Sequence, residues 1–120
     1  MAALSQLAER RVGDVTIIAL SGRCEDGDVT VREWIDALAR DGRVKVILDL
    51  HAVQYLDSTG VGTLAAKYLT LRRQGGDLKL LSVPRQSLQL LTVTKLITVF
   101  ERFDNEDEAV ASFGGKVNVP

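Results

Sequence analysis

Residues 44–62 read VKVILDLHAVQYLDSTGVG, and two different patterns follow one another within them. The run at 44–50 is rich in β-branched residues and almost continuously apolar, which is typical of a central strand covered on both faces. Asp57 or Ser58 then supplies an N-cap, and apolar residues recur with a 3.6-residue period until the glycine pair at 75–76. The stretch therefore predicts a buried strand that leads directly into an amphipathic helix.

Strand and helix patterns also alternate on both sides of this unit. Gly13-Asp14 is typical of a hairpin turn that follows a segment near Leu7, and Asp28 and Gly42 are placed to start and stop a helix. The further expected elements are a strand at 12–20, a helix between 28 and 42, a strand at 77–82, a helix at 86–93, an edge strand at 97–103 and a helix at 105–113. This order predicts an α/β fold with a largely parallel sheet of roughly four to five strands and about four helices.

The composition is that of one domain close to electrical neutrality. The 120 residues carry 15 Lys and Arg against 16 Asp and Glu, a net charge of −1, so no global basic field drives direct binding to nucleic acid. We expect one domain over residues 1–113 and a frayed tail over 114–120. Because no apolar run is long enough to cross a membrane and the first residues lack a signal peptide's apolar stretch, we expect a cytoplasmic domain with no membrane partner.

The scarcity of reactive residue types excludes several kinds of site. Cys24 is the one cysteine, which excludes an internal disulfide and a multi-cysteine zinc site. His51 is the one histidine, so a histidine-based metal cluster would also need carboxylates. We therefore expect no metal and no cofactor. Cys24 fits a small buried hydrophobe, His51 fits a loop residue after a strand, and Trp34 and Tyr68 fit packing residues on helices.

The candidate site lies where the buried strand meets the helix, in the segment Asp57-Ser58-Thr59-Gly60-Val61-Gly62. The free amides and the macrodipole of a helix start favour negative charge at this position. Gly60 and Gly62 remove side chains, so another backbone or an anion can approach closely, although each glycine costs the helix roughly 1 kcal/mol. Two interpretations stay open: a capped helix start, and a site that handles an anion or a phosphate.

Known phosphate-binding and catalytic motifs do not match this segment. Neither Lys-Ser nor Lys-Thr follows Gly62 as in a P-loop, and the third glycine of a dinucleotide-binding fingerprint is missing. Ser58 lacks the Gly-x-Ser-x-Gly context of a serine hydrolase, and His51 is the only candidate for its histidine base. We therefore do not expect a serine hydrolase.

An ordered set of segments resembles a known family. The segments run between about Thr16 and Phe113: LSGR at 20–23, VILDL at 46–50, VQYLDSTGVG at 53–62, GGDL at 75–78, LLTVTKL at 90–96 and VF at 99–100. Together they resemble the STAS domain family, and within it the bacterial anti-sigma factor antagonists. The resemblance implies a single STAS-like α/β domain.

The resemblance also implies a protein that takes part in partner switching and is not itself an enzyme. In this family an anti-sigma factor that is also a serine kinase binds the antagonist, which frees a sigma factor for transcription. The kinase phosphorylates the first hydroxyl residue after the aspartate, here Ser58, and ends the interaction; a serine phosphatase restores it. The family's partner contacts correspond in this chain to Gly22, Arg23, Glu25, Asp57, Ser58, Thr59, Gly60, Val61 and Gly62.

Three positions depart from the family pattern. Cys24-Glu25 stands where the family often has Leu-Asp. The acidic residue is therefore present as Glu25, but the reach of its side chain differs from that of an aspartate. Lys95 stands where many relatives have glycine at a helix end, which makes a left-handed turn harder to form. Thr59 replaces the second serine of many members, and whether it is an alternate phosphate acceptor stays open.

Two other functions stay open on the sequence alone. A STAS domain can also be a non-switching subunit of a signalling scaffold or a transport assembly, and Ser58 would then stay unmodified. Alternatively, the helix N-terminus binds a nucleotide or another small anion as a sensor. The oligomeric state stays open between a monomer and a weak dimer, because an N-terminal edge strand can pair with a second copy.

Overall fold

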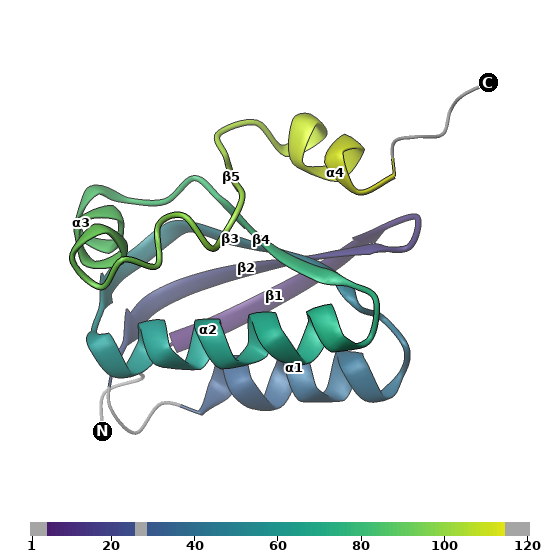
Figure 1. Cartoon of the computed structure of the whole chain (residues 1–120), viewed down its shortest axis with the longest axis horizontal. Helices are drawn as coiled ribbons and strands as arrows, with labels where there is room; N and C mark the ends of the chain where they lie inside the picture. Colours follow the sequence, from purple (N-terminus) through teal and green to yellow (C-terminus); the bar gives the residue numbers. More distant parts are fainter. Residues whose placement is uncertain (1–4, 26–28, 115–120) are drawn as a thin grey trace.

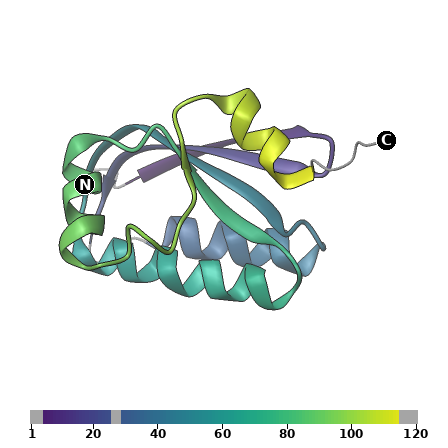
Figure 2. The same cartoon turned by 45° about the horizontal axis from the view of Figure 1, so that its top comes forward.

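A mixed β-sheet with helices on both faces forms the fold of the computed structural model, which describes residues 5–25 and 29–114 (Figures 1 and 2). The strand order is β1-β2-β3-β4-β5; β1 and β2 are antiparallel, and each later pair is parallel. The elements are β1 (Ser5–Val12), β2 (Val15–Cys24), α1 (Thr30–Arg40), β3 (Lys45–Leu56), α2 (Ser58–Arg73), β4 (Asp77–Leu81), α3 (Arg85–Val93), β5 (Arg102–Phe103) and α4 (Glu106–Gly114). The predicted α/β fold with a largely parallel sheet is confirmed.

β3 is the central strand and is covered on both sides where its sequence is most apolar. Val46, Ile47 and Leu48 are fully buried. One face of the sheet packs against α1 and α2 in the larger core, and α4 covers a smaller cluster on the other face (Figure 2). The prediction of a central strand is therefore confirmed, although the strand begins at Lys45 and continues to Leu56.

α1 follows the predicted helix pattern. Its inner face buries Val31, Ile35 and Leu38. The helix ends before Gly42, whose positive φ of 78° needs the conformational freedom of glycine. The expected cap, Asp28, lies outside the described residues; the residue at the cap position, Val29, makes no side-chain cap hydrogen bond.

The expected edge strand at 97–103 is wrong except for its last two residues. β5 spans only 102–103, and the chain before it forms turns. The amide of Leu96 donates to the carbonyl of Leu91 (2.9 Å), which folds the chain back onto the end of α3. Phe100 lies in the core of the helix-covered face. The apolar pattern of this segment therefore reflects burial in turns and not pairing in a strand.

Other expectations are corrected in detail. The Gly13-Asp14 turn is confirmed, but Val12 ends β1 and does not begin β2. His51 lies within β3 with an exposed side chain, because α4 covers only part of that face of the sheet, so the expected loop position is wrong. Trp34 is 38% exposed and is not a core residue.

Lys95 adopts a left-handed backbone conformation (φ 65°) in the turn that follows α3. This conformation costs a residue with a side chain about 1–2 kcal/mol, a strain that glycine avoids. Glycine also raises the conformational entropy of the unfolded chain, which offsets part of this gain in stability. We therefore expect Lys95→Gly to raise the free energy of unfolding by about 0.5–1 kcal/mol in urea denaturation. Lys95→Ala removes the charge and keeps the strain, so a glycine variant that is no more stable than the alanine variant would contradict this account.

Candidate functional site

The two segments assigned to partner contact, 22–25 and 57–62, lie side by side at the carboxyl ends of β2 and β3. These strands are parallel neighbours, and Cys24 is in register with Leu56. The amide of Asp57 donates to the carbonyl of Cys24 (3.1 Å), which ties the start of α2 to the end of β2. The structure thus places the two segments together, and their contact with a partner stays a prediction.

Asp57, and not Ser58, is the N-cap of α2. Its backbone is extended (φ −103°, ψ 179°), and its carboxylate accepts a hydrogen bond from the amide of Gly60 (2.8 Å). Ser58 is the first residue of the helix, its side chain is exposed, and its hydroxyl has no hydrogen-bond partner among the described residues. A chemical change at the Ser58 hydroxyl therefore leaves the cap in place.

Only one of the two glycines in the site permits a close internal contact. A Cβ atom at Gly60 would lie 2.6 Å from Cδ1 of Leu56 and 3.2 Å from the carbonyl oxygen of Cys24. A Cβ atom at Gly62 would meet nothing within 4 Å, and Gly62 is exposed. Gly60 therefore permits the expected close approach, and the atoms that approach it belong to this chain. Gly62 has no such neighbour and leaves a patch without a side chain on the helix surface.

Alanine substitutions of these glycines are expected to have opposite effects. Gly62→Ala should raise the free energy of unfolding by about 1 kcal/mol, because alanine is the better helix former and the space is open. Gly60→Ala should lower it by about 1–2 kcal/mol, because buried Leu56 has little room to move away. Denaturant unfolding of the two variants measures both changes, and a stabilised Gly60→Ala variant would contradict the packing described at this junction.

Arg23 is held at the surface beside the site. The β2–β3 register shifts at Gly22-Arg23, and Gly22 has a positive φ of 91°. The Arg23 guanidinium donates two hydrogen bonds to the Glu25 carboxylate (2.8 and 3.0 Å) and lies 4.7 Å from the ring centroid of Tyr55. The hydrogen bond from Arg23 holds the pKa of Glu25 below its usual range.

Gln86 positions the end of β3, a role that its sequence context does not predict. β3 and β4 pair only as far as Asp49 and Leu81, which leaves the last residues of β3 without a backbone partner on that side. The Gln86 side chain replaces that partner: its Oε1 accepts from the amide of Leu56 (3.0 Å), and its Nε2 donates to the carbonyl of Leu56 (2.7 Å). A glutamine in a short helix gives no local signal of this long-range contact.

The site is a surface and not a ligand cavity. The hollow between α1 and the start of α2, lined in part by Cys24, Thr59 and Gly60, has a volume of about 20 Å³, which is room for about one water molecule. Sites for small molecules usually enclose about 300–1,000 Å³. This hollow is therefore too small for a nucleotide.

Neither a metal centre nor a membrane-spanning helix is present in residues 5–25 and 29–114. They contain no group of three His, Cys, Asp or Glu side chains arranged to hold a metal ion. In the same ranges, no helix has both the length and the apolar character that crossing a membrane requires.

The fold and the site define a STAS domain. The STAS domain model matches residues 6–109, and this chain belongs to the STAS domain family. It is 26% identical over 98 residues to the anti-sigma F factor antagonist of Paenibacillus polymyxa, an alignment that covers 80% of this chain and 84% of that protein.

Solved structures share the fold at low sequence identity. An anti-sigma factor antagonist from Mycobacterium paratuberculosis superposes with a TM-score of 0.80 at 22% identity, covering 91% of this chain and 93% of that one. The Bacillus cell fate determinant SpoIIAA in its phosphorylated form gives a TM-score of 0.71 at 19% identity, covering 89% and 98%. At these identities the likeness concerns the fold alone.

Proposed function

We propose that this chain is an anti-sigma factor antagonist that binds an anti-sigma factor serine kinase in the cytoplasm and thereby releases a sigma factor. Phosphorylation of Ser58 by that kinase ends the interaction, and a serine phosphatase restores it. The names of the curated relative and of a solved structure support the antagonist role. A structure of SpoIIAA in a phosphorylated form supports regulation by phosphate. In this proposal the chain is a substrate and a binding partner, and it is not the catalyst.

The environment of Ser58 is the observation that carries the proposal. Its side chain is exposed at the first position of α2, and its hydroxyl has no hydrogen-bond partner within the described residues. A kinase therefore meets a free hydroxyl, because the neighbouring Asp57 already caps the helix. Thr59 is also exposed, which keeps it as the alternate acceptor.

The fold of this chain tolerates a phosphate at Ser58. The modification adds about −1.5 to −2 charges, and a helix N-terminus stabilises negative charge by about 0.3–1 kcal/mol. The same charge is unfavourable for a partner that has to desolvate it in the interface. The switch therefore acts on binding and needs no change in the fold.

The surface around Ser58 suits a protein partner. Gly62 leaves the outer side of α2 bare one turn further on, at a cost in helix stability that no contact in the described chain offsets. The Arg23–Glu25 pair adds a fixed polar rim. A partner backbone that approaches Gly62 closely would account for this glycine.

Phosphorylation by the cognate anti-sigma kinase tests the proposal directly. The purified chain is incubated with the kinase and ATP, and the product is mapped by mass spectrometry. We expect one phosphate, on Ser58, in the wild type and in Thr59→Ala, and none in Ser58→Ala. A phosphate on Thr59 in Ser58→Ala would instead show that Thr59 is an alternate acceptor. A kinase that phosphorylates another known substrate but leaves Ser58 unmodified would overturn the switch.

A further inference from the structure

β1 offers a free backbone edge over most of its length. It is the first strand in the sheet order and pairs only with β2. The two-residue turn at Gly13-Asp14 closes with the pair Val12 and Val15, and the closing pair of such a hairpin exchanges both of its hydrogen bonds. Hydrogen-bonded and non-hydrogen-bonded pairs alternate along the two strands. The backbone N–H and C=O groups of Glu9 and Arg11 therefore point away from β2, where no other described strand pairs with them.

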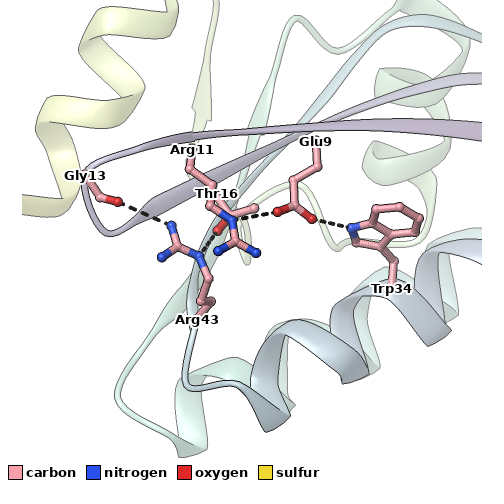
Figure 3. A network of polar contacts seen from close by, with 6 residues as sticks. All are labelled: Glu9, Arg11, Gly13, Thr16, Trp34 and Arg43. Atoms are coloured by element: carbon pink, nitrogen blue, oxygen red, sulfur yellow. Dashed lines mark hydrogen bonds and ion pairs between the residues drawn. The ribbon is translucent and has the colours of Figure 1, made fainter.

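An open groove runs beside this edge, between β1 and α1. Glu9 and Arg11 line it from the strand, and its α1 side includes Glu33, Trp34 and Ala37; its volume is about 420 Å³. Trp34 is 38% exposed, and its indole Nε1 donates to the Glu9 carboxylate (2.8 Å), which holds the ring against the strand edge (Figure 3). A tryptophan fixed in this position presents an apolar wall to anything that lies along β1.

The lining of the groove carries three carboxylates and one guanidinium, and a second guanidinium, that of Arg43, lies near Glu9 while it donates to Thr16 and Gly13 (Figure 3). Glu9 is compensated, because the Arg11 guanidinium donates to it (2.8 Å) and, together with the Trp34 indole, lowers its pKa (Figure 3). Glu33 and Asp41 also line the groove and are exposed, and neither has an ion-pair partner among residues 5–25 and 29–114. The carboxylates of Glu33 and Asp41 are therefore available to a cationic group of a molecule that binds in the groove.

The spacing of these carboxylates matches that of an extended chain. Glu33 and Asp41 are eight positions apart, which is about 12 Å along a helix axis. Two side chains on the same face of a strand and four residues apart are about 13 Å apart. A strand added to β1 therefore directs such a pair of side chains toward the two carboxylates, and the side chain that meets Glu33 lies near Trp34, the next residue of α1.

We propose that the β1 edge and this groove bind an extended segment of a partner protein that carries two Lys or Arg residues four positions apart. Its backbone extends the sheet beside Glu9 and Arg11, and its basic side chains meet Glu33 and Asp41. One of these cations also lies within reach of the Trp34 ring, where a cation–π contact favours it. This surface is separate from Ser58, and the inference does not depend on the phosphorylation switch.

The charge distribution favours this occupant over a second copy of the chain. Pairing of two β1 strands would bring Glu33 and Asp41 of both copies toward the same interface. The groove-facing side of β1 offers Arg11 as its cation, and Arg11 is already bound to Glu9. A second copy therefore adds negative charge to the groove without neutralising it.

Titration with a defined peptide tests the proposal, and Trp34, the one tryptophan of the chain, reports it by fluorescence. The probe is the capped peptide Thr-Lys-Thr-Val-Thr-Lys-Thr, and the matched control has glutamate in place of both lysines. We expect the lysine peptide to change the Trp34 emission saturably and to shift the amide resonances of Glu9 and Arg11. The glutamate peptide should bind at least about fivefold more weakly, and the double variant Glu33→Gln/Asp41→Asn should lose a similar factor for the lysine peptide.

Three results would overturn the proposal. One is the absence of any shift at Glu9, Arg11 and the Trp34 indole up to millimolar lysine peptide. Another is equal affinity for the two peptides. The third is a concentration-dependent dimer in sedimentation that shifts the same resonances, which would assign the edge to a second copy. Ser58→Asp, a change outside the groove, should leave the peptide affinity unchanged.

Discussion

Phosphorylation of Ser58 is expected to weaken binding of the anti-sigma kinase about 100-fold, which corresponds to about 2.8 kcal/mol. The Ser58 side chain is exposed, and a binding interface over it has to desolvate the added charge. Ser58→Asp introduces a smaller charge and should weaken binding about tenfold, whereas Ser58→Ala should bind like the wild type. Calorimetric titration of the kinase with each form measures these affinities.

A charge elsewhere on the same helix separates a local effect from a change in net charge. Ala66 is exposed in the middle of α2, so Ala66→Asp adds the same charge at a different place. We expect Ala66→Asp to bind within about twofold of the wild type. The Ser58 variants should unfold at similar denaturant concentrations because Asp57 keeps the cap, whereas Ala66→Asp should be destabilised by about 0.7 kcal/mol through its lower helix propensity. Equal affinities of Ser58→Ala and Ser58→Asp would contradict the charge argument.

Gly76→Ala is expected to lower the free energy of unfolding by at least about 3 kcal/mol, the largest stability effect proposed for this chain. An added Cβ atom would lie 2.0 Å from the carbonyl oxygen of Val44 and 2.5 Å from its Cβ atom. That carbonyl already accepts the amide of Asp77 (2.9 Å), so the backbone at the start of β3 and β4 cannot move without breaking the sheet. Urea unfolding followed by circular dichroism measures the loss.

The neighbouring Gly75 gives a matched control for this steric argument. It has a positive φ of 85°, but an added Cβ atom would meet nothing within 4 Å. Gly75→Ala should therefore cost about 1–2 kcal/mol from backbone strain alone. Equal destabilisation by the two substitutions would show that conformation, and not the contact with Val44, decides the effect at Gly76.

Periodicity and turn residues were enough to predict most of the fold, and they failed where burial came from distant contacts. The run at 44–50 predicted the central strand because full burial leaves an apolar signature. The strand continues past His51 to Leu56 because it pairs with β2 over this length. The sheet face near its end is open, so exposed residues flank buried Val53 and the apolar signature is lost. The segment at 97–103 looked like a strand because its apolar residues pack onto the core from turns.

The sequence predicts the position of the candidate site along the chain, but it does not predict the geometry within that site. An acidic residue and a hydroxyl residue precede apolar residues that recur with the helical period, which predicts a helix with a capped start. On the sequence alone, either Asp57 or Ser58 can be the N-cap residue. The choice of Asp57 depends on the backbone angles that the connection to β2 imposes through Cys24. The support from Gln86 joins residues thirty positions apart, and no local pattern predicts such a contact.

The central claim, that Ser58 is a phosphorylation switch, is tested most directly in the native cell. The protein is isolated during growth and under stress, and its intact mass and phosphopeptides are measured. The account predicts a single added phosphate, located on Ser58, whose occupancy differs between the two conditions. Protein that is unmodified under both conditions would contradict the switch; Ser58 would then be only the first residue of α2, and a non-switching STAS subunit would be the better description.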